Sequence, residues 1–133
     1  MKHEYHTKIR FGDTDAAGIM YYPNFYRRMD ESTHELFEAA GYSVSVLQSK
    51  EDIILPILEA SCQFHEPLYF EDRATICSEV TKVDRKVFRI DHTFKKGDRL
   101  ISEGYEVRAW TSVKENIPKA IPIPDHIKTI LKS

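Results

Sequence analysis

The sequence of 133 residues has few of the features that mark metal-binding, redox-active or disulfide-rich proteins. Its only cysteines, Cys62 and Cys77, are fifteen positions apart and form no C-x-x-C pair. Neither a zinc site nor a thioredoxin-type redox motif is therefore predicted. Both cysteines lie in apolar strand patterns, where a free thiol packs as a small hydrophobe. We expect inert thiols, no metal site and no cofactor.

Long apolar runs and an excess of one charge are also missing. No stretch approaches the ~20 apolar residues that a membrane helix needs, and the polar alternation at residues 1–6 lacks the apolar centre of a signal peptide. The 19 basic and 21 acidic side chains give a net charge of −2, so no global positive field predicts nucleic-acid binding. We expect a cytoplasmic protein that binds neither membrane nor nucleic acid.

What the sequence does contain is an ordinary globular composition, with 41% hydrophobic and 30% charged residues. A chain of this length fits one domain, residues 1–133, and buries roughly two-thirds of the surface that its unfolded form exposes. The period of the apolar pattern then predicts the order of elements. Expected are a first strand at 4–11, a helix from about 24 to 40 that Gly41 ends, a loop at 43–52 with a short helical turn, strands at 53–64, 73–83, 87–95 and about 99–113, and a terminal helix at 125–131.

Short turns join the last four strands, so the sheet is predicted to be antiparallel. One apolar helix against one such sheet makes a two-layer α+β domain. In the last strand, the predicted core face carries Ile101, Tyr105, Val107, Ala109 and Val113. Trp110 and Leu100 are assigned to the outward face.

The loop at residues 11–22 places Asp15 beside a glycine, directly ahead of the long helix. A carboxylate and free backbone N–H groups at the positive end of a helix dipole therefore come together. These are the groups needed to attack a carbonyl and to hold the oxyanion that forms. From the residues alone, an aspartate in this place is more often a turn residue or a cap.

The run Phe-Gly-Asp-x-Asp-x-Ala-Gly-Ile-x-x-Tyr-Pro-Asn, followed by an arginine and Asp30 within the helix, resembles the signature of the 4-hydroxybenzoyl-CoA thioesterase family of hotdog-fold enzymes. The resemblance implies an antiparallel five-stranded sheet wrapped around one long central helix. It also implies hydrolysis of an aryl (4-hydroxybenzoyl-like) or short acyl-CoA thioester, coenzyme A being part of the substrate. A sister branch that acts on short acyl thioesters has a histidine at the position of Tyr22, so this chain is more similar to the aromatic branch. The matching positions are Asp13, Asp15, Gly18, Tyr22, Pro23 and Asn24.

The same resemblance makes Asp15 the catalytic carboxylate and the Tyr22 N–H the group that polarises the thioester carbonyl. Whether Asp15 attacks directly or activates water as a general base stays open. Asp13 is expected to hold the loop through bonds to backbone N–H groups. Gly18 is expected to supply an unusual φ or a close approach to the substrate, and Pro23 and Asn24 complete the expected binding loop.

Two further groups of charged residues are substrate-binding candidates. Arg85 and Lys86 lie in a turn between two predicted strands, and in the family such residues meet the phosphates of coenzyme A from the neighbouring subunit. Lys82 and Arg89 are weaker candidates of the same kind, and a solvated hairpin tip is the alternative for the group. By the same resemblance, Asp30 meets a ring hydroxyl. The alternative for Asp30 is a helix-surface acid paired with His34 or Arg27.

The remaining polar residues have simpler expected roles. His92 and His34 are predicted to be a satisfied core histidine and a surface histidine, and Glu59 either lines the pocket or faces solvent. The resemblance implies a homodimer or homotetramer, because hotdog proteins pair two sheets edge to edge and often stack the dimers. Rival functions are a non-catalytic thioester-binding domain and a hydratase or dehydratase, whose loop needs a histidine that residues 16–22 lack.

Overall fold

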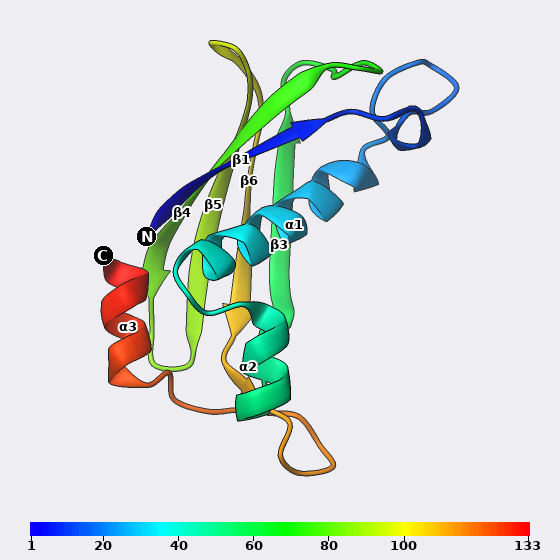
Figure 1. Cartoon of the computed structure of the whole chain (residues 1–133). Coiled ribbons are helices and arrows are strands. Elements are labelled where there is room, and N and C mark those ends of the chain that lie inside the picture. The colour runs from blue at the N-terminus through cyan, green and yellow to red at the C-terminus, as the bar shows by residue number, and fades with distance from the viewer.

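A five-stranded antiparallel sheet with a long helix across one face forms the body of the protein, as shown by a computed structural model of residues 1–133 (Figure 1). The strand order is β1-β4-β5-β6-β3. This confirms the predicted α+β class and the antiparallel pairing. The strands are β1 (Lys2–Lys8), β3 (Ile57–Phe64), β4 (Arg73–Val83), β5 (Val87–Lys96) and β6 (Arg99–Ala109).

Three helices are present: α1 (Pro23–Ala39), α2 (Val44–Glu51) and α3 (Asp125–Lys132). The first and last were predicted within a residue or two at each end. The prediction of a loop at 43–52 was wrong, because α2 occupies most of it. Leu47 is the only fully buried residue of α2, so the sequence shows no apolar stripe at helical spacing there.

The predicted strand 53–64 is divided in two at Pro56, which has no N–H to give to a strand ladder. Its first part, β2 (Ile53–Ile54), leaves the main sheet and joins a small second sheet of order β2-β7-β8. The partners there are β7 (Thr111–Ser112) and β8 (Lys119–Ala120). The last predicted strand is likewise shared between two sheets, β6 belonging to the first and β7 to the second.

Helix α1 packs on the inner face of the sheet through the apolar stripe predicted from its sequence, and Arg28 is buried beside that stripe. The close approach depends on Gly104 in β6. A Cβ atom at this position would lie 2.6 Å from both the Sδ atom of Met29 and the carbonyl oxygen of Ser61, which is shorter than any normal contact. The buried residues of α1 are Phe25, Arg28, Met29, Ser32, Thr33, Leu36 and Phe37.

The predicted faces of the last strand were right for Ile101 and Ala109, which are buried, and for Leu100, which is exposed, but wrong for the charged residues between them and for Trp110. Phe94, His92, Ile90 and Phe88 of β5 pair with Ser102, Gly104, Glu106 and Arg108 of β6, and this register turns Glu106 and Arg108 to the core. Trp110, assigned to the outward face, is only 1% exposed. The prediction failed because it ranked positions by apolarity, whereas Glu106 and Arg108 are buried as an ion pair, 3.0 Å apart.

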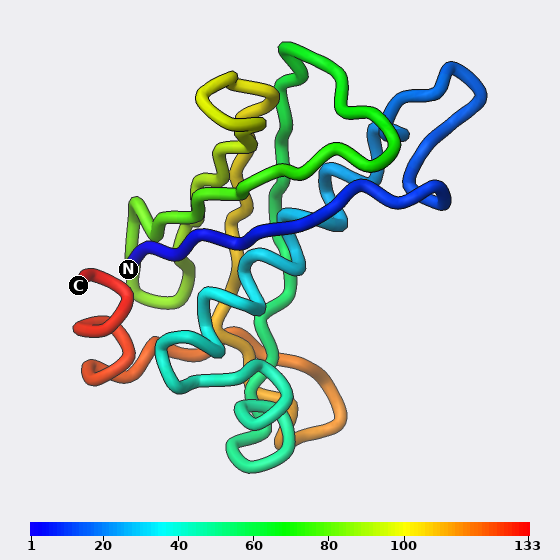
Figure 2. Tube along the Cα trace, turned by 45° about the horizontal axis from the view of Figure 1, so that its top comes forward, coloured from blue at the N-terminus to red at the C-terminus, as the bar shows by residue number.

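The two ends of the sheet carry different structures (Figure 2). At one end, the loop from β1 to α1 lies beside the connection from β3 to β4, and the Met20 N–H donates to the Leu68 carbonyl at 2.7 Å. At the other end lie the β4–β5 turn, helix α3 and both termini, and the amino group of Met1 donates to the Leu131 carbonyl at 3.3 Å. No helix is long and apolar enough to cross a membrane.

Candidate functional site

The loop that carries Asp15 is closed by its own backbone. Thr14 and Met20 form an antiparallel bridge, the Asp15 N–H donates to the Ile19 carbonyl at 3.0 Å, and the Gly18 N–H donates to the Asp15 carbonyl at 2.9 Å. Gly18 has φ +80°, and a Cβ atom there would meet nothing within 4 Å. The unusual φ expected for this glycine is therefore present, and the chain itself does not crowd the position.

One oxygen of the Asp15 carboxylate is held by a hydrogen bond, and the other is free. Its Oδ1 atom accepts the Ala17 N–H at 2.9 Å, and Oδ2 has no hydrogen-bond partner within the chain. The residue is exposed. The free oxygen is therefore available to take a proton from water or to attack an electrophile.

The start of α1 supplies the hydrogen-bond donor. Tyr22 is the N-cap residue and Pro23 is the first residue of the helix. The Tyr22 N–H donates to no acceptor within the chain, while the Tyr22 carbonyl accepts the Phe25 N–H at 3.1 Å. An unpaired N–H at the positive end of a 17-residue helix is suited to stabilise an oxyanion.

Asp15 and Tyr22 line one groove with a volume of about 480 Å³. Its walls are largely apolar and aromatic, and the Phe64 ring lies 5.0 Å from that of Phe25 and 6.4 Å from that of Tyr22, measured between centroids. Such walls suit a flat aromatic group. The lining residues are Asp15, Ile19, Met20, Tyr21, Tyr22, Phe25, Phe64, His65, Glu66 and Pro67.

Two titratable residues of this groove, His65 and Glu66, were not predicted. They follow β3 in the connection to β4, and nothing in the sequence relates that connection to the Asp15 loop. The His65 Nε2 atom lies 3.1 Å from a Glu103 oxygen, and Glu66 forms an ion pair with Arg99. Both side chains therefore have partners at the rim of the groove.

Asp13 anchors the loop, as predicted. Its buried carboxylate accepts the Arg10 N–H and an Nη2 hydrogen of Arg28, each at 2.7 Å. Its carbonyl accepts the Tyr21 N–H at 2.8 Å and the side-chain amide of Asn24 at 2.9 Å. Asn24 therefore binds the loop itself.

Three of the expected substrate-binding residues, Gly18, Pro23 and Asn24, are not among those that line the groove. They shape the loop and the start of α1. Asp30 also lies outside the groove. Its Oδ1 atom accepts an Nη2 hydrogen of Arg108 at 2.7 Å and is 3.6 Å from the Nε2 atom of His34, which is one of its two predicted surface partners.

Arg85 and Lys86 lie in the β4–β5 turn, at the far end of β4 from the Asp15 loop (Figure 1). The 11 residues of β4 span about 35 Å at 3.2–3.4 Å per residue. These two residues and Asp15 therefore do not meet within one chain. Neither Arg85 nor Lys86 forms an ion pair.

Lys82 and Arg89, the two weaker candidates for phosphate binding, are already paired with acidic side chains. The Lys82 ammonium lies 3.6 Å from Asp84. The Arg89 guanidinium lies 2.9 Å from Asp91 and 3.8 Å from the centre of the Tyr105 ring. Arg85 and Lys86 therefore remain the freer cations of the group.

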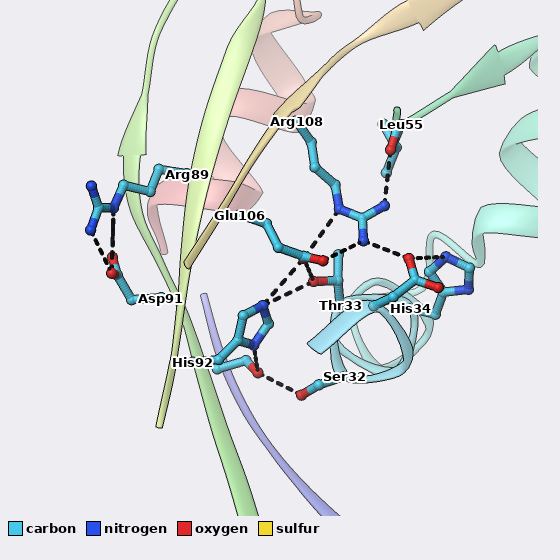
Figure 3. Close-up of polar contacts among 11 residues, drawn as sticks. Ser32, Thr33, His34, Leu55, Arg89, Asp91, His92, Glu106 and Arg108 are labelled. Carbon is cyan, nitrogen blue, oxygen red and sulfur yellow. Dashed lines mark hydrogen bonds and ion pairs between the residues drawn. The ribbon is translucent and has the colours of Figure 1, made fainter. Parts of the chain in front are cut away.

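A chain of buried polar side chains crosses the interface between α1 and the sheet (Figure 3). The Ser78 Oγ atom is 2.7 Å from His92 Nδ1, and His92 Nε2 is 3.2 Å from Glu106 Oε1. None of the three residues is more than 2% exposed. His92 is thus a satisfied core histidine, as predicted.

Glu106 is the centre of this buried chain. Thr33 donates to it at 2.5 Å, and Arg108 donates to it at 3.0 and 3.2 Å and to the Leu55 carbonyl at 2.9 Å. Burial alone would raise the pKa of Glu106, but the His92 hydrogen bond, the Arg108 charge and the remaining hydrogen bonds outweigh it and lower the pKa to about 2. Glu106 is therefore ionised at neutral pH.

The remaining residues weighed for a metal site or for the pocket are the two cysteines and Glu59. Cys62 and Cys77 are half-buried and free, and burial raises the pKa of the Cys62 thiol. The chain has no group of three or more histidine, cysteine or acidic side chains placed to hold a metal ion. Glu59 is exposed on the edge strand β3 of the single chain.

Residues 9–131 match the family model described as the thioesterase-like superfamily. A gentisyl-coenzyme A thioesterase of known structure is 39% identical, with a TM-score of 0.88 over 98% of this chain and 100% of that one. The 1,4-dihydroxy-2-naphthoyl-CoA hydrolase of Thermosynechococcus vestitus is 28% identical over 129 residues, 95% of this chain and 88% of the relative.

The 4-hydroxybenzoyl-CoA thioesterase of Pseudomonas sp. strain CBS-3 has the same fold. It is 24% identical, with a TM-score of 0.88 over 97% of this chain and 98% of that one. These findings confirm the resemblance drawn from the sequence motif. With a family match along nearly its whole length, the chain belongs to the thioesterase-like superfamily.

Proposed function

We propose that this protein is a thioesterase that hydrolyses an aryl-CoA thioester to the free acid and coenzyme A. The single observation that carries the proposal is the placement of the free Asp15 Oδ2 atom and the unpaired Tyr22 N–H in one aromatic-walled groove. The relatives named for gentisyl-CoA and dihydroxynaphthoyl-CoA support a hydroxylated aromatic acyl group.

The chemistry follows from these two groups. The Tyr22 N–H donates to the thioester oxygen and stabilises the negative charge that develops there. Asp15 then acts in one of two ways. It attacks the carbonyl carbon, expels the thiolate and leaves an anhydride that water hydrolyses, or it takes a proton from a water molecule that attacks in its place. Both routes use the chain and water alone, so the proposal includes no metal or cofactor.

The proposal also includes a second copy of the chain. Strand β3 is an edge strand, and Ile57, Leu58 and Phe64 on it are between 44% and 61% exposed. An apolar unpaired edge is a surface that a partner covers. We place Arg85 and Lys86 of one copy against the coenzyme A phosphates at the Asp15 groove of the other, since one chain keeps them apart.

Three finer expectations from the sequence belong to the same proposal. In the assembled protein the sheet wraps around α1, the assembly is a homodimer or homotetramer, and it works in the cytoplasm. Light scattering measures the assembly, and an active monomer would contradict it. Cell fractionation checks the location.

The test is release of free thiol from gentisyl-CoA, 1,4-dihydroxy-2-naphthoyl-CoA, 4-hydroxybenzoyl-CoA, benzoyl-CoA and an aliphatic acyl-CoA, with Asp15→Asn as the control. We expect turnover of at least one aryl thioester by the wild type and little by the variant. Tight binding of aryl-CoA without thiol release would instead favour the non-catalytic thioester-binding domain. Release of thiol only from aliphatic thioesters would remove the aryl assignment.

A further inference from the structure

Arg28 is a buried cation that the sequence did not single out. It lies in the second turn of α1 and is 7% exposed. Its Nη2 atom donates to Asp13 Oδ2 at 2.7 Å, its Nε atom donates to Thr7 Oγ1 at 3.1 Å, and its Nη1 atom lies 3.6 Å from Glu31 Oε1. The guanidinium therefore joins α1 to β1 and to the loop between them.

Asp13 connects Arg28 to both groups of the proposed mechanism, Asp15 and the Tyr22 N–H, through the backbone. It precedes Asp15 by two residues, and its carbonyl accepts the N–H of Tyr21, the residue before Tyr22. Asp13 is 7% exposed, whereas Asp15, Tyr21 and Tyr22 are all exposed. The ion pair with Arg28 is thus a buried anchor of the segment that carries these exposed residues.

We propose that Arg28 is a positioning residue for thioester hydrolysis, acting through Asp13 to fix Asp15 relative to the Tyr22 N–H. The inference rests on the proposed function. The Asp15 carboxylate, or the water that it activates, must reach the carbon of the carbonyl group whose oxygen accepts the Tyr22 N–H. A misplacement of about 1 Å can cost about 100-fold in rate. A guanidinium suits this task because its rigid fork donates in several directions at once.

The first experiment measures kcat and KM of Arg28→Met and Arg28→Lys on the best aryl-CoA substrate. Arg28→Met is expected to lower kcat by about 10–100-fold with KM within about threefold, because the reacting groups shift while the coenzyme A contacts remain. Arg28→Lys is expected to recover part of the loss in kcat, since it keeps the charge. The matched control is Arg27→Met, since Arg27 is exposed and forms no ion pair; it should stay within about twofold of the wild type.

The second experiment shows whether Arg28 acts through Asp13. If it does, the effects of Asp13→Asn and Arg28→Met do not add, and the double variant has a kcat within about threefold of the worse single variant. Losses in kcat that multiply would overturn the inference. So would an Arg28→Met enzyme that loses only thermal stability and keeps its kcat.

The design remains decisive if Arg28→Met fails to fold, because the double variant removes both buried charges and Thr7→Val removes only the Nε partner of Arg28. Both are expected to have a lowered kcat, and wild-type kcat in both would overturn the inference. An inactive wild type on every thioester would instead reject the proposed function, so the two failures are told apart.

Discussion

The Asp15 groove and the buried chain around Glu106 contain the same kinds of group in opposite settings. Ser78, His92 and Glu106 follow the serine–histidine–acid order of serine hydrolases, although the serine here meets Nδ1 of the histidine and the acid meets Nε2, and all three are buried in the core. Asp15 forms no hydrogen bond with a histidine, but it is exposed and shares a groove of about 480 Å³ with an unpaired N–H. An inventory of residues alone would favour the buried chain as the catalytic site.

The two regions differ in whether a substrate can reach their polar groups. In the buried chain, Ser78, His92 and Glu106 already have partners, so they contribute order and a fixed position of α1 on the sheet. At the groove, one carboxylate oxygen and one N–H are left without partners where a substrate can reach them. Unpaired groups of this kind are what a catalytic site needs, and they are costly anywhere that water is excluded.

The largest expected effect on stability comes from breaking the buried chain. Glu106→Gln removes the charge that Arg108 and His92 surround, and losing one partner of a buried ion pair costs about 3–5 kcal/mol in the free energy of unfolding. Chemical denaturation measures this. The matched control is Asp91→Asn, which breaks the partly exposed pair with Arg89 and should cost about 0–1 kcal/mol. Equal losses in both variants would contradict the contrast between buried and exposed pairs.

Acid should weaken the buried chain next. The pKa of Glu106 in the folded protein, about 2, lies below its ordinary value of 4.5, so its ionised form stabilises the fold. This contribution is complete above about pH 5 and is lost as the pH falls toward 2, on the order of 3 kcal/mol in all. Unfolding curves between pH 6 and 2 measure it. In Glu106→Gln that part of the slope should be absent, and an unchanged slope would assign it to other carboxylates.

The contrast between the two regions also explains how far the sequence could be interpreted. The Asp15 loop was predictable because its contacts are local: Asp13, Gly18 and the start of α1 all act within ten residues of one another. The buried chain was not predictable, because Thr33, His92 and Glu106 come from three elements. They are brought together by the register of the sheet and by the packing of α1 on it. Glu106 and Arg108 alternate on β6 like solvent-facing residues, so apolarity placed them outside. The role of Arg28 was missed for the same reason, since its partner Asp13 lies across the helix start.

Asp30 is connected to the buried chain, because one of its carboxylate oxygens accepts from Arg108 while the other has no partner. If the free oxygen accepts a ring hydroxyl, Asp30→Ala should lower kcat/KM for 4-hydroxybenzoyl-CoA, by an amount that corresponds to about 1.5–3 kcal/mol in activation free energy. It should barely change kcat/KM for benzoyl-CoA. The two substrates control for each other. Equal losses on both, or none, would leave Asp30 as the surface partner of His34.

The smallest effect is expected at the far end of the sheet. Replacing Arg85 and Lys86 together by alanine should raise KM several-fold with little change in kcat, because distant phosphates are bound alike in the ground and transition states. The salt dependence of KM should also flatten. The double replacement of Lys82 and Arg89, which are already paired with acids, is the matched control. An unchanged KM and an unchanged salt response would mean that Arg85 and Lys86 only form a solvated turn and do not bind the phosphates.

The most direct test of the account compares kcat of Asp15→Asn and Ser78→Ala on one aryl-CoA substrate. Asp15→Asn is almost isosteric and should lower kcat by about 10²–10⁴-fold with unchanged thermal stability. Ser78→Ala should lose about 1–3 kcal/mol of stability, and its folded fraction should keep kcat within about twofold of the wild type. A fully active Asp15→Asn enzyme, or a Ser78→Ala enzyme that is folded but inactive, would contradict the claim that the exposed groove carries the chemistry.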